Sequence, residues 1–141
     1  MAIRDRFIAD YLLPTPISAN TTVGAFTDLG SFINLICQLI VSGTPTGGAP
    51  TLDIYLQTSI DGGVTFYDIA HTQYTTSQTT RIISIAGDAA GSASPVTATD
   101  GTLTGETVRQ GPWGDQFRLK LVFAAGASTG SYTLAAKLFF D

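Results

Sequence analysis

The sequence has little charge of either sign. Only 13% of its 141 residues are charged, whereas an ordinary soluble domain carries about 25%. The basic residues are scattered and the net charge is −4, so the clustered cations needed to bind nucleic acid or an anionic membrane are missing. Uncharged polar residues can keep such a surface soluble, or other subunits can cover it. We favour the second interpretation, because depletion of charge is typical of surface buried between chains.

The sequence is also short of the groups used in catalysis and metal binding. Cys37 is the only cysteine, which excludes an intrachain disulfide and a four-thiolate metal site, and its apolar neighbours predict a buried, inert thiol. His71 is the only histidine and Glu106 the only glutamate, and no nucleophile elbow or pair of carboxylates accompanies them. Most aspartates lie in turn sequences, and the spacing of Asp88 and Asp100 matches no calcium loop. We therefore predict no enzyme, no cofactor and no metal site.

Long apolar runs are absent as well. The densest run, residues 35–41, is interrupted by Gln38 and is far shorter than the roughly 20 residues that span a bilayer. At the N-terminus, Arg4 and Arg6 are followed by a short apolar stretch that ends at Asp10, which does not fit a signal peptide. We therefore expect synthesis in a cytoplasm and no membrane partner.

Alternation of apolar and polar residues dominates the chain after residue 20. It is clearest in residues 51–58, where we expect Leu52 and Leu56 to face inward and Tyr55 and Gln57 to face outward. No convincing helix appears in this part of the chain, and turn residues separate the alternating stretches. The expected strands are residues 22–27, 32–41, 51–58, 65–70, 79–86, 103–109, 116–124 and 131–140.

Residues 32–41 are apolar on both faces of the expected strand. Ile36 and Ile40 alternate with Leu35 and Leu39, which predicts a central strand covered on both sides. Together, the strands predict an all-β fold: an antiparallel β-sandwich of about eight strands, jelly-roll or immunoglobulin-like.

The chain is predicted to consist of an N-terminal arm, residues 1–20, and a single sandwich domain, residues 21–141. Pro14 and Pro16 favour extended backbone, while the apolar spacing in residues 5–13 allows a short helical turn. Such a leader can fold onto its own domain or reach onto a neighbouring subunit, and we favour the reaching arm. Its expected contact residues are Ile3, Phe7, Ile8, Tyr11, Leu12, Leu13, Pro14 and Pro16.

A long segment rich in Ala, Gly, Ser and Asp covers residues 87–102. Loops longer than about 12–15 residues without regular structure are usually functional or mobile. This segment is therefore a second candidate contact region.

The turn between two of the expected strands resembles the Asp-box, Ser-x-Asp-x-Gly-x-Thr-Trp. Residues 59–66 read Ser-Ile-Asp-Gly-Gly-Val-Thr-Phe, in which the Asp carboxylate is expected to accept hydrogen bonds from turn amides and the second Gly to take a positive φ. In sialidases and related propellers the motif recurs and is structural, whereas here it occurs once in a chain too short for a propeller. We predict a structural turn made by Ser59, Asp61, Gly63, Thr65 and Phe66.

The aromatic residues allow a different function. Trp113, the only tryptophan, could stack on sugar rings together with Tyr55 and Tyr67, as in carbohydrate-binding modules. The alternative is that Trp113 closes one end of the sandwich, and we favour this structural role.

The order of these parts is similar to that of small β-sandwich virion proteins of tailed bacteriophages, especially capsid decoration (cement) proteins. The similarity covers residues 51–141. It rests on Asp-Gly-Gly-x-Thr-aromatic at 61–66, Arg-Leu-Lys-Leu-Val-Phe at 118–123 and Ser-Tyr-Thr-Leu-Ala-Ala-Lys-Leu at 131–138, after a leader that contains prolines.

The resemblance implies a structural protein of the virion, made in the host cytoplasm and located on the capsid surface. Its implied partners are the major capsid protein and copies of itself, in a homotrimer, and it would act by adhesion and not by catalysis. A neck or tail component of the virion is an alternative in the same class. A carbohydrate-binding module is the alternative from another class.

Overall fold

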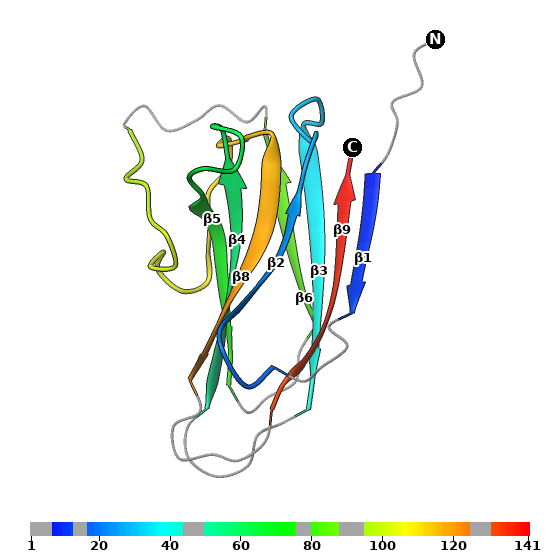
Figure 1. Cartoon of the computed structure of the whole chain (residues 1–141), viewed down its shortest axis with the longest axis vertical. Helices are drawn as coiled ribbons and strands as arrows, with labels where there is room; N and C mark the ends of the chain where they lie inside the picture. Colours follow the sequence, from blue (N-terminus) through cyan, green and yellow to red (C-terminus); the bar gives the residue numbers. More distant parts are fainter. Residues whose placement is uncertain (1–6, 13–16, 44–49, 76–79, 88–94, 125–130) are drawn as a thin grey trace.

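Two antiparallel β-sheets packed face to face form the protein (Figure 1). The computed structural model describes residues 7–12, 17–43, 50–75, 80–87, 95–124 and 131–141. Within these ranges the regular structure is all strand, and no helix is long and apolar enough to cross a membrane. The strands are β1 (Phe7–Leu12), β2 (Thr21–Phe26), β3 (Asn34–Ser42), β4 (Thr51–Ser59), β5 (Tyr67–Tyr74), β6 (Thr80–Ala86), β7 (Thr107–Val108), β8 (Gln116–Ala124) and β9 (Thr133–Phe140).

The strand order is that of a jelly roll. The first sheet has the order β1-β9-β3-β6 and the second has the order β2-β8-β4-β5-β7. Except for the β4–β5 hairpin and the two-residue β7, consecutive strands alternate between the sheets, as in an eight-stranded jelly roll. In an immunoglobulin-like sandwich the last two strands share a sheet, whereas here β8 and β9 lie in different sheets. The predicted all-β sandwich is therefore confirmed, and its topology is the jelly-roll alternative.

The core fills the space between the inner faces of the two sheets. Alternate residues of each long strand point into it, and Phe117 and Phe140 meet across it with ring centroids 5.2 Å apart. Cys37 is buried on β3, and this burial raises the pKa of its thiol to about 12, which makes it inert as predicted. The fully buried core residues of the central strands include Leu35, Leu39, Leu52, Ile54, Leu56, Leu119, Leu121, Leu134 and Leu138.

The leader differs from the sequence prediction. Residues 7–12 form the strand β1, not part of a helical turn, and pair antiparallel with β9 from Phe7 opposite Phe140 to Leu12 opposite Ala135. Without β1, the backbone of β9 would be an unpaired sheet edge. In the single chain these residues therefore complete the first sheet, whereas the sequence set residues 1–20 apart as an arm.

Two expected strand faces are also different in the structure. Ile36 and Ile40 are 45% and 42% exposed, so the prediction that this strand is covered on both sides is wrong for the single chain. Conversely, Tyr55 and Gln57, expected to face solvent, are 6% and 0% exposed. A later segment of the chain covers the outer face of the second sheet, whereas no described segment covers that of the first.

We expect Leu119→Ala to lower the free energy of unfolding by about 2–5 kcal/mol, because Leu119 is fully buried on β8, an interior strand of the second sheet, and its truncation leaves a cavity. Val64→Ala is the control, since Val64 is 85% exposed and should change stability by no more than about 0.5 kcal/mol. Urea denaturation followed by fluorescence measures both values. Equal stability of the two variants would contradict this assignment of the core.

Candidate functional site

The turn between β4 and β5 is closed by its own side chains. The Ser59 hydroxyl accepts from the Gly63 amide at 3.0 Å and donates to Asp61 Oδ1 at 2.8 Å, and this same oxygen accepts the Thr65 amide at 2.8 Å. Gly63 has the expected positive φ, 90°, and a Cβ at this position would lie 2.6 Å from Gln116 Oε1. The hydrogen bonds from Thr65 and Ser59 lower the pKa of Asp61 to about 2.

Phe66, the last residue of this motif, packs on the outer face of the second sheet. It is 8% exposed, and the Arg118 guanidinium lies 4.0 Å from its ring centroid. Ile60 and Val64, at the end of the hairpin, are instead 69% and 85% exposed. We call these two residues the hairpin tip. The turn therefore has the local hydrogen bonds of a structural motif and holds two apolar side chains in solvent.

Residues 95–106, which we call the strap, cross the outer side of β4 and β5 (Figure 1). The strap is fastened by Asp68, a fully buried residue of β5. Its carboxylate accepts the amides of Gly101 at 2.9 Å and of Thr102 and Leu103 at 3.1 Å, and Gln57 Nε2 at 2.8 Å. Three successive amides that converge in this way form a concave anion site, and here the chain's own carboxylate occupies it.

The charge of Asp68 is stabilised despite its burial. Desolvation by burial raises the pKa of this carboxyl, but the hydrogen bonds from Gln57 and from the strap amides outweigh desolvation, so the pKa lies below its usual value. Asp68 is therefore ionised at neutral pH, as its four donors require.

A second carboxylate continues this polar network toward solvent. Asp100 of the strap accepts from Gln57 Nε2 and from Lys120 Nζ, both at 2.8 Å, and these contacts lower its pKa. The Gln57 carbonyl in turn accepts Arg118 Nε at 2.7 Å. The long segment that the sequence marked as a contact region is thus, over its described part, fixed to its own sheet.

His71 lies under the strap with both ring nitrogens engaged. Nδ1 is 2.7 Å from the Leu103 carbonyl oxygen and Nε2 is 2.7 Å from Asp53 Oδ1, while the Tyr55 ring stacks on the imidazole with centroids 4.1 Å apart. Both ring nitrogens are therefore within hydrogen-bonding distance of oxygen atoms of the same chain. The sequence did not single out Asp53, because its contact with His71 depends on the register between β4 and β5.

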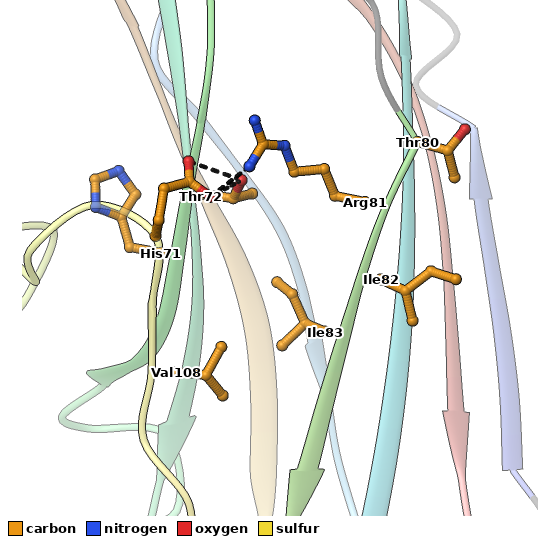
Figure 2. A pocket seen from close by; sticks show the side chains of 8 residues that line it. His71, Thr72, Thr80, Arg81, Ile82, Ile83 and Val108 are labelled. Atoms are coloured by element: carbon orange, nitrogen blue, oxygen red, sulfur yellow. Dashed lines mark hydrogen bonds and ion pairs between the residues drawn. The ribbon is translucent and has the colours of Figure 1, made fainter.

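A shallow cavity of about 380 Å³ opens beside this histidine, between β6 and the edge of the second sheet (Figure 2). Glu106 accepts the Gln73 amide at 2.9 Å and the Thr72 hydroxyl at 3.2 Å, and it forms an ion pair with Arg81 of the first sheet. The charged groups of the cavity therefore join the two sheets. Within the described part of the chain, no group of three or more His, Cys, Asp or Glu is placed to hold a metal ion.

The aromatic residues expected to stack on sugars are used in packing. Trp113 donates from its indole nitrogen to the Leu29 carbonyl at 3.1 Å and packs edge-on against Phe117, so it closes one end of the sandwich. Tyr55 is buried against the histidine, and Tyr67 lines a separate cavity of about 260 Å³ near the hairpin tip. These rings do not form a common exposed platform.

The predicted arm contacts are only partly described. Phe7, Ile8, Tyr11 and Leu12 lie in β1, opposite residues of β9. Ile3, Leu13, Pro14 and Pro16 lie outside the described residues.

The structure reveals an apolar surface that sequence reasoning missed. The outward side chains of β3 and β6 include Ile36, Ile40 and Ile82, which are 45%, 42% and 64% exposed. We call these three residues the apolar face. The sequence did indicate this surface, because residues 32–41 are apolar on both faces of the strand. We interpreted this pattern as a strand covered on both sides.

Comparison with protein-family models, with curated proteins and with solved structures gave no match. Inferences about function therefore rest on the residues and contacts described above.

We expect Asp68→Asn to lower the free energy of unfolding by about 1–3 kcal/mol at neutral pH, because an amide donor would face the strap amides. Since the pKa of folded Asp68 lies below its unfolded value, the wild-type carboxylate stabilises the fold fully above about pH 4 and this stabilisation is lost as the pH falls through the folded pKa. The difference between variant and wild type should therefore shrink in acid. Urea denaturation over a pH series tests this, with the exposed Asp28→Asn as control; a difference independent of pH would contradict it.

A carbon-detected NMR titration should give a pKa of about 2 for Asp61. In Ser59→Ala we expect this pKa to move up toward the ordinary aspartate value of about 3.9, because the hydroxyl that donates to the carboxylate is removed. Ile60→Ala serves as the matched control, since its side chain points into solvent beside the same turn. An unchanged Asp61 pKa in Ser59→Ala would show that the hydroxyl does not stabilise the charge.

Proposed function

We propose that this chain is a structural virion protein that binds and stabilises the assembled capsid shell of a tailed bacteriophage. The observation that carries the proposal is the hairpin tip. Ile60 and Val64 are 69% and 85% exposed, although a network of short hydrogen bonds fixes the turn that carries them. Apolar side chains held rigidly in solvent are suited to binding another protein at a low cost in conformational entropy.

The surroundings of the tip support the same proposal. A cavity of about 260 Å³ lies beside Ile60 and is lined by Tyr67, Val96 and Pro112 among others. Val96 is itself 50% exposed. A protruding apolar tip next to an apolar hollow can interlock with a partner surface.

The hydrogen bonds and ion pairs of the polar groups support adhesion rather than catalysis. The buried Asp68 and His71 are engaged with the strap, and Glu106 pairs with Arg81, so these groups are not free to act on a substrate. Weak contacts repeated over a symmetric shell give a high combined affinity without any reactive site.

The fold and the sequence resemblance point in the same direction. Jelly rolls occur in viral capsid proteins and in lectins, and a fold alone does not determine function. Between these two, the packing of Trp113 and Tyr55 inside the protein weakens the carbohydrate-binding alternative. The proposed partners are the major capsid protein and copies of this chain, and a neck or tail location belongs to the same class.

We expect the protein to co-sediment with shells assembled from the major capsid protein of the same genome. The double variant Ile60→Lys, Val64→Lys should bind at least about tenfold more weakly, because it places two charges in the apolar contact. Val108→Lys is the control, since Val108 is also an exposed valine, at 41%, but lines the cavity beside His71 and not the one beside the tip.

Undiminished sedimentation of the double variant would overturn the tip as the docking element. Absence of shell binding by the wild type, together with binding to a glycan array, would favour the carbohydrate-binding alternative.

A further inference from the structure

The free edge of β6 carries main-chain groups that can pair with another strand. β6 is the last strand of the first sheet and pairs with β3 along one side only. In an antiparallel strand the amide and carbonyl groups of successive residues point to alternate sides. The Ser84 carbonyl and the Ala86 amide point away from β3, because both bond to Gln110. The amide and carbonyl groups of Thr80 and Ile82 therefore lie along the same free side, and no other described strand pairs with them.

Gln110 closes one end of this edge. Its side-chain amide accepts from the Ala86 amide at 2.7 Å and donates to the Ser84 carbonyl at 2.8 Å, as the main chain of a neighbouring strand would. The next residue, Gly111, donates its amide to the Ala86 carbonyl at 3.0 Å. The open part of the edge is thus limited to residues 80–84.

The other edges of the sandwich are less suited to pairing. In the second sheet, β7 has only two residues and β2 has a register shift, and short or irregular edge strands resist pairing with another chain. The other edge of the first sheet, β1, contains Asp10, and charged residues on an edge strand oppose pairing. The outward residues of the open β6 edge, Thr80, Ile82 and Ser84, carry no charge.

We infer that two copies of this chain pair antiparallel through β6, edge to edge, so that their first sheets become one continuous sheet across a two-fold axis at Ile82. Addition of a strand to an exposed sheet edge is a common mode of binding between chains. A two-fold contact is self-complementary, because the same residues are used on both copies. The inference concerns a part of the protein separate from the hairpin tip and holds whether or not the protein binds a capsid.

The sequence of the open edge favours a second copy as the partner. Its outward residues are polar, apolar and polar in either direction: Thr80, Ile82 and Ser84. An antiparallel copy centred on Ile82 places this residue opposite its own equivalent and places Thr80 opposite Ser84. A Thr–Ser pair can form a cross-strand hydrogen bond. The isoleucine pair covers a side chain that is 64% exposed in the single chain.

The main chain fits the same register. Because the amide and carbonyl of Ile82 both point to the free side, each copy can donate one hydrogen bond at this residue and accept one. Thr80 and Ser84 extend the ladder on both sides of the axis. A register shifted toward Ala86 would have to displace the Gln110 side chain. A register centred on Arg81 would place two like charges opposite each other, which is destabilising.

The charges of the first sheet are compatible with this contact. The side chains of Arg81 and Ile83 point toward the second sheet (Figure 2), where Arg81 forms an ion pair with Glu106. In the proposed register Arg81 lies opposite Ile83 of the other copy, so the two guanidinium groups do not face each other. The other charged residues in the strands of this sheet, Asp10 and Lys137, lie opposite each other on β1 and β9, beyond β3 from the contact.

Light scattering coupled to size-exclusion chromatography tests the association without any capsid. We expect the wild type to be a dimer and Ile82→Pro to dissociate at least about tenfold more readily, because proline removes the amide that each copy donates across the axis. Proline is tolerated on an edge strand where the amide faces away from the sheet, so the variant should keep its fold, which urea denaturation checks. Ile82→Val is the matched control and should stay dimeric, since it keeps the amide and a β-branched side chain. A monomeric or trimeric wild type, or a dimer that a folded Ile82→Pro leaves intact, would overturn the inference.

Cysteine cross-linking tests the register and does not depend on the proline variant. Directly opposite residues of this kind have Cα atoms about 5.5 Å apart, within the range of a disulfide. Under oxidation, Ile82→Cys should therefore form linked dimers alone, and Thr80→Cys should do so only when mixed with Ser84→Cys. Ile60→Cys is the control, since Ile60 is similarly exposed, at 69%, but lies at the hairpin tip, and the buried Cys37 gives the background. Cross-linking of Thr80→Cys with itself, or of Ile60→Cys as readily as Ile82→Cys, would contradict the proposed pairing.

The dimer test and the shell-binding test can fail separately. A protein that dimerises but does not bind shells would leave this inference standing and overturn the proposed function. A monomer that binds shells through the hairpin tip would do the reverse. The homotrimer implied by the resemblance cannot be built from a two-fold contact alone.

Discussion

The buried carboxylate of Asp68 is the interaction on which the outer side of the second sheet depends. A charge without solvent is costly unless hydrogen bonds replace its water, and here the donors come from residues 101–103 and from Gln57. The strap therefore cannot leave the sheet without exposing an anion site and an unpartnered carboxylate. Gln57 also binds Asp100 and Arg118. The hydrogen bonds around the Asp68 carboxylate therefore link the strap to the strands beneath it.

This arrangement makes the two outer faces of the sandwich different. The second sheet is covered by the strap, and the polar residues Gln57 and His71 are buried beneath it. The first sheet has no such cover among the described residues, and its outward positions include Ile36 and Ile82. The core of a jelly roll forms between the inner faces of its two sheets. The residue types on each outer face therefore depend on whether another segment covers that face. Polar networks belong to the face covered by its own chain, and apolar side chains to the bare one.

Features that depend on residues close together in the sequence could be predicted for this protein, whereas features that depend on distant residues could not. The turn hydrogen bonds were predictable because Ser59 and Asp61 act within a few residues. Strand faces followed from alternation, yet the burial of Gln57 did not, since its cover lies 43 residues later in the chain. The strand β1 was missed because a pairing with the last strand of the chain leaves no local signal. The apolar face was visible as a pattern in residues 32–41, but a pattern does not say whether the cover comes from the same chain or another.

The pairing of the polar groups and the exposure of apolar side chains indicate which surfaces of the protein are suited to binding. The buried carboxylate of Asp68 is hydrogen-bonded within the chain, and the more exposed Glu106 and Arg81 pair with each other, so these polar groups stabilise the fold. Among the described residues, the large apolar side chains that are exposed include those of the hairpin tip and of the apolar face, which belong to different sheets. Burial of apolar surface is non-directional and needs only matching shape. Two separate apolar surfaces of this kind can each be buried against a different partner at the same time.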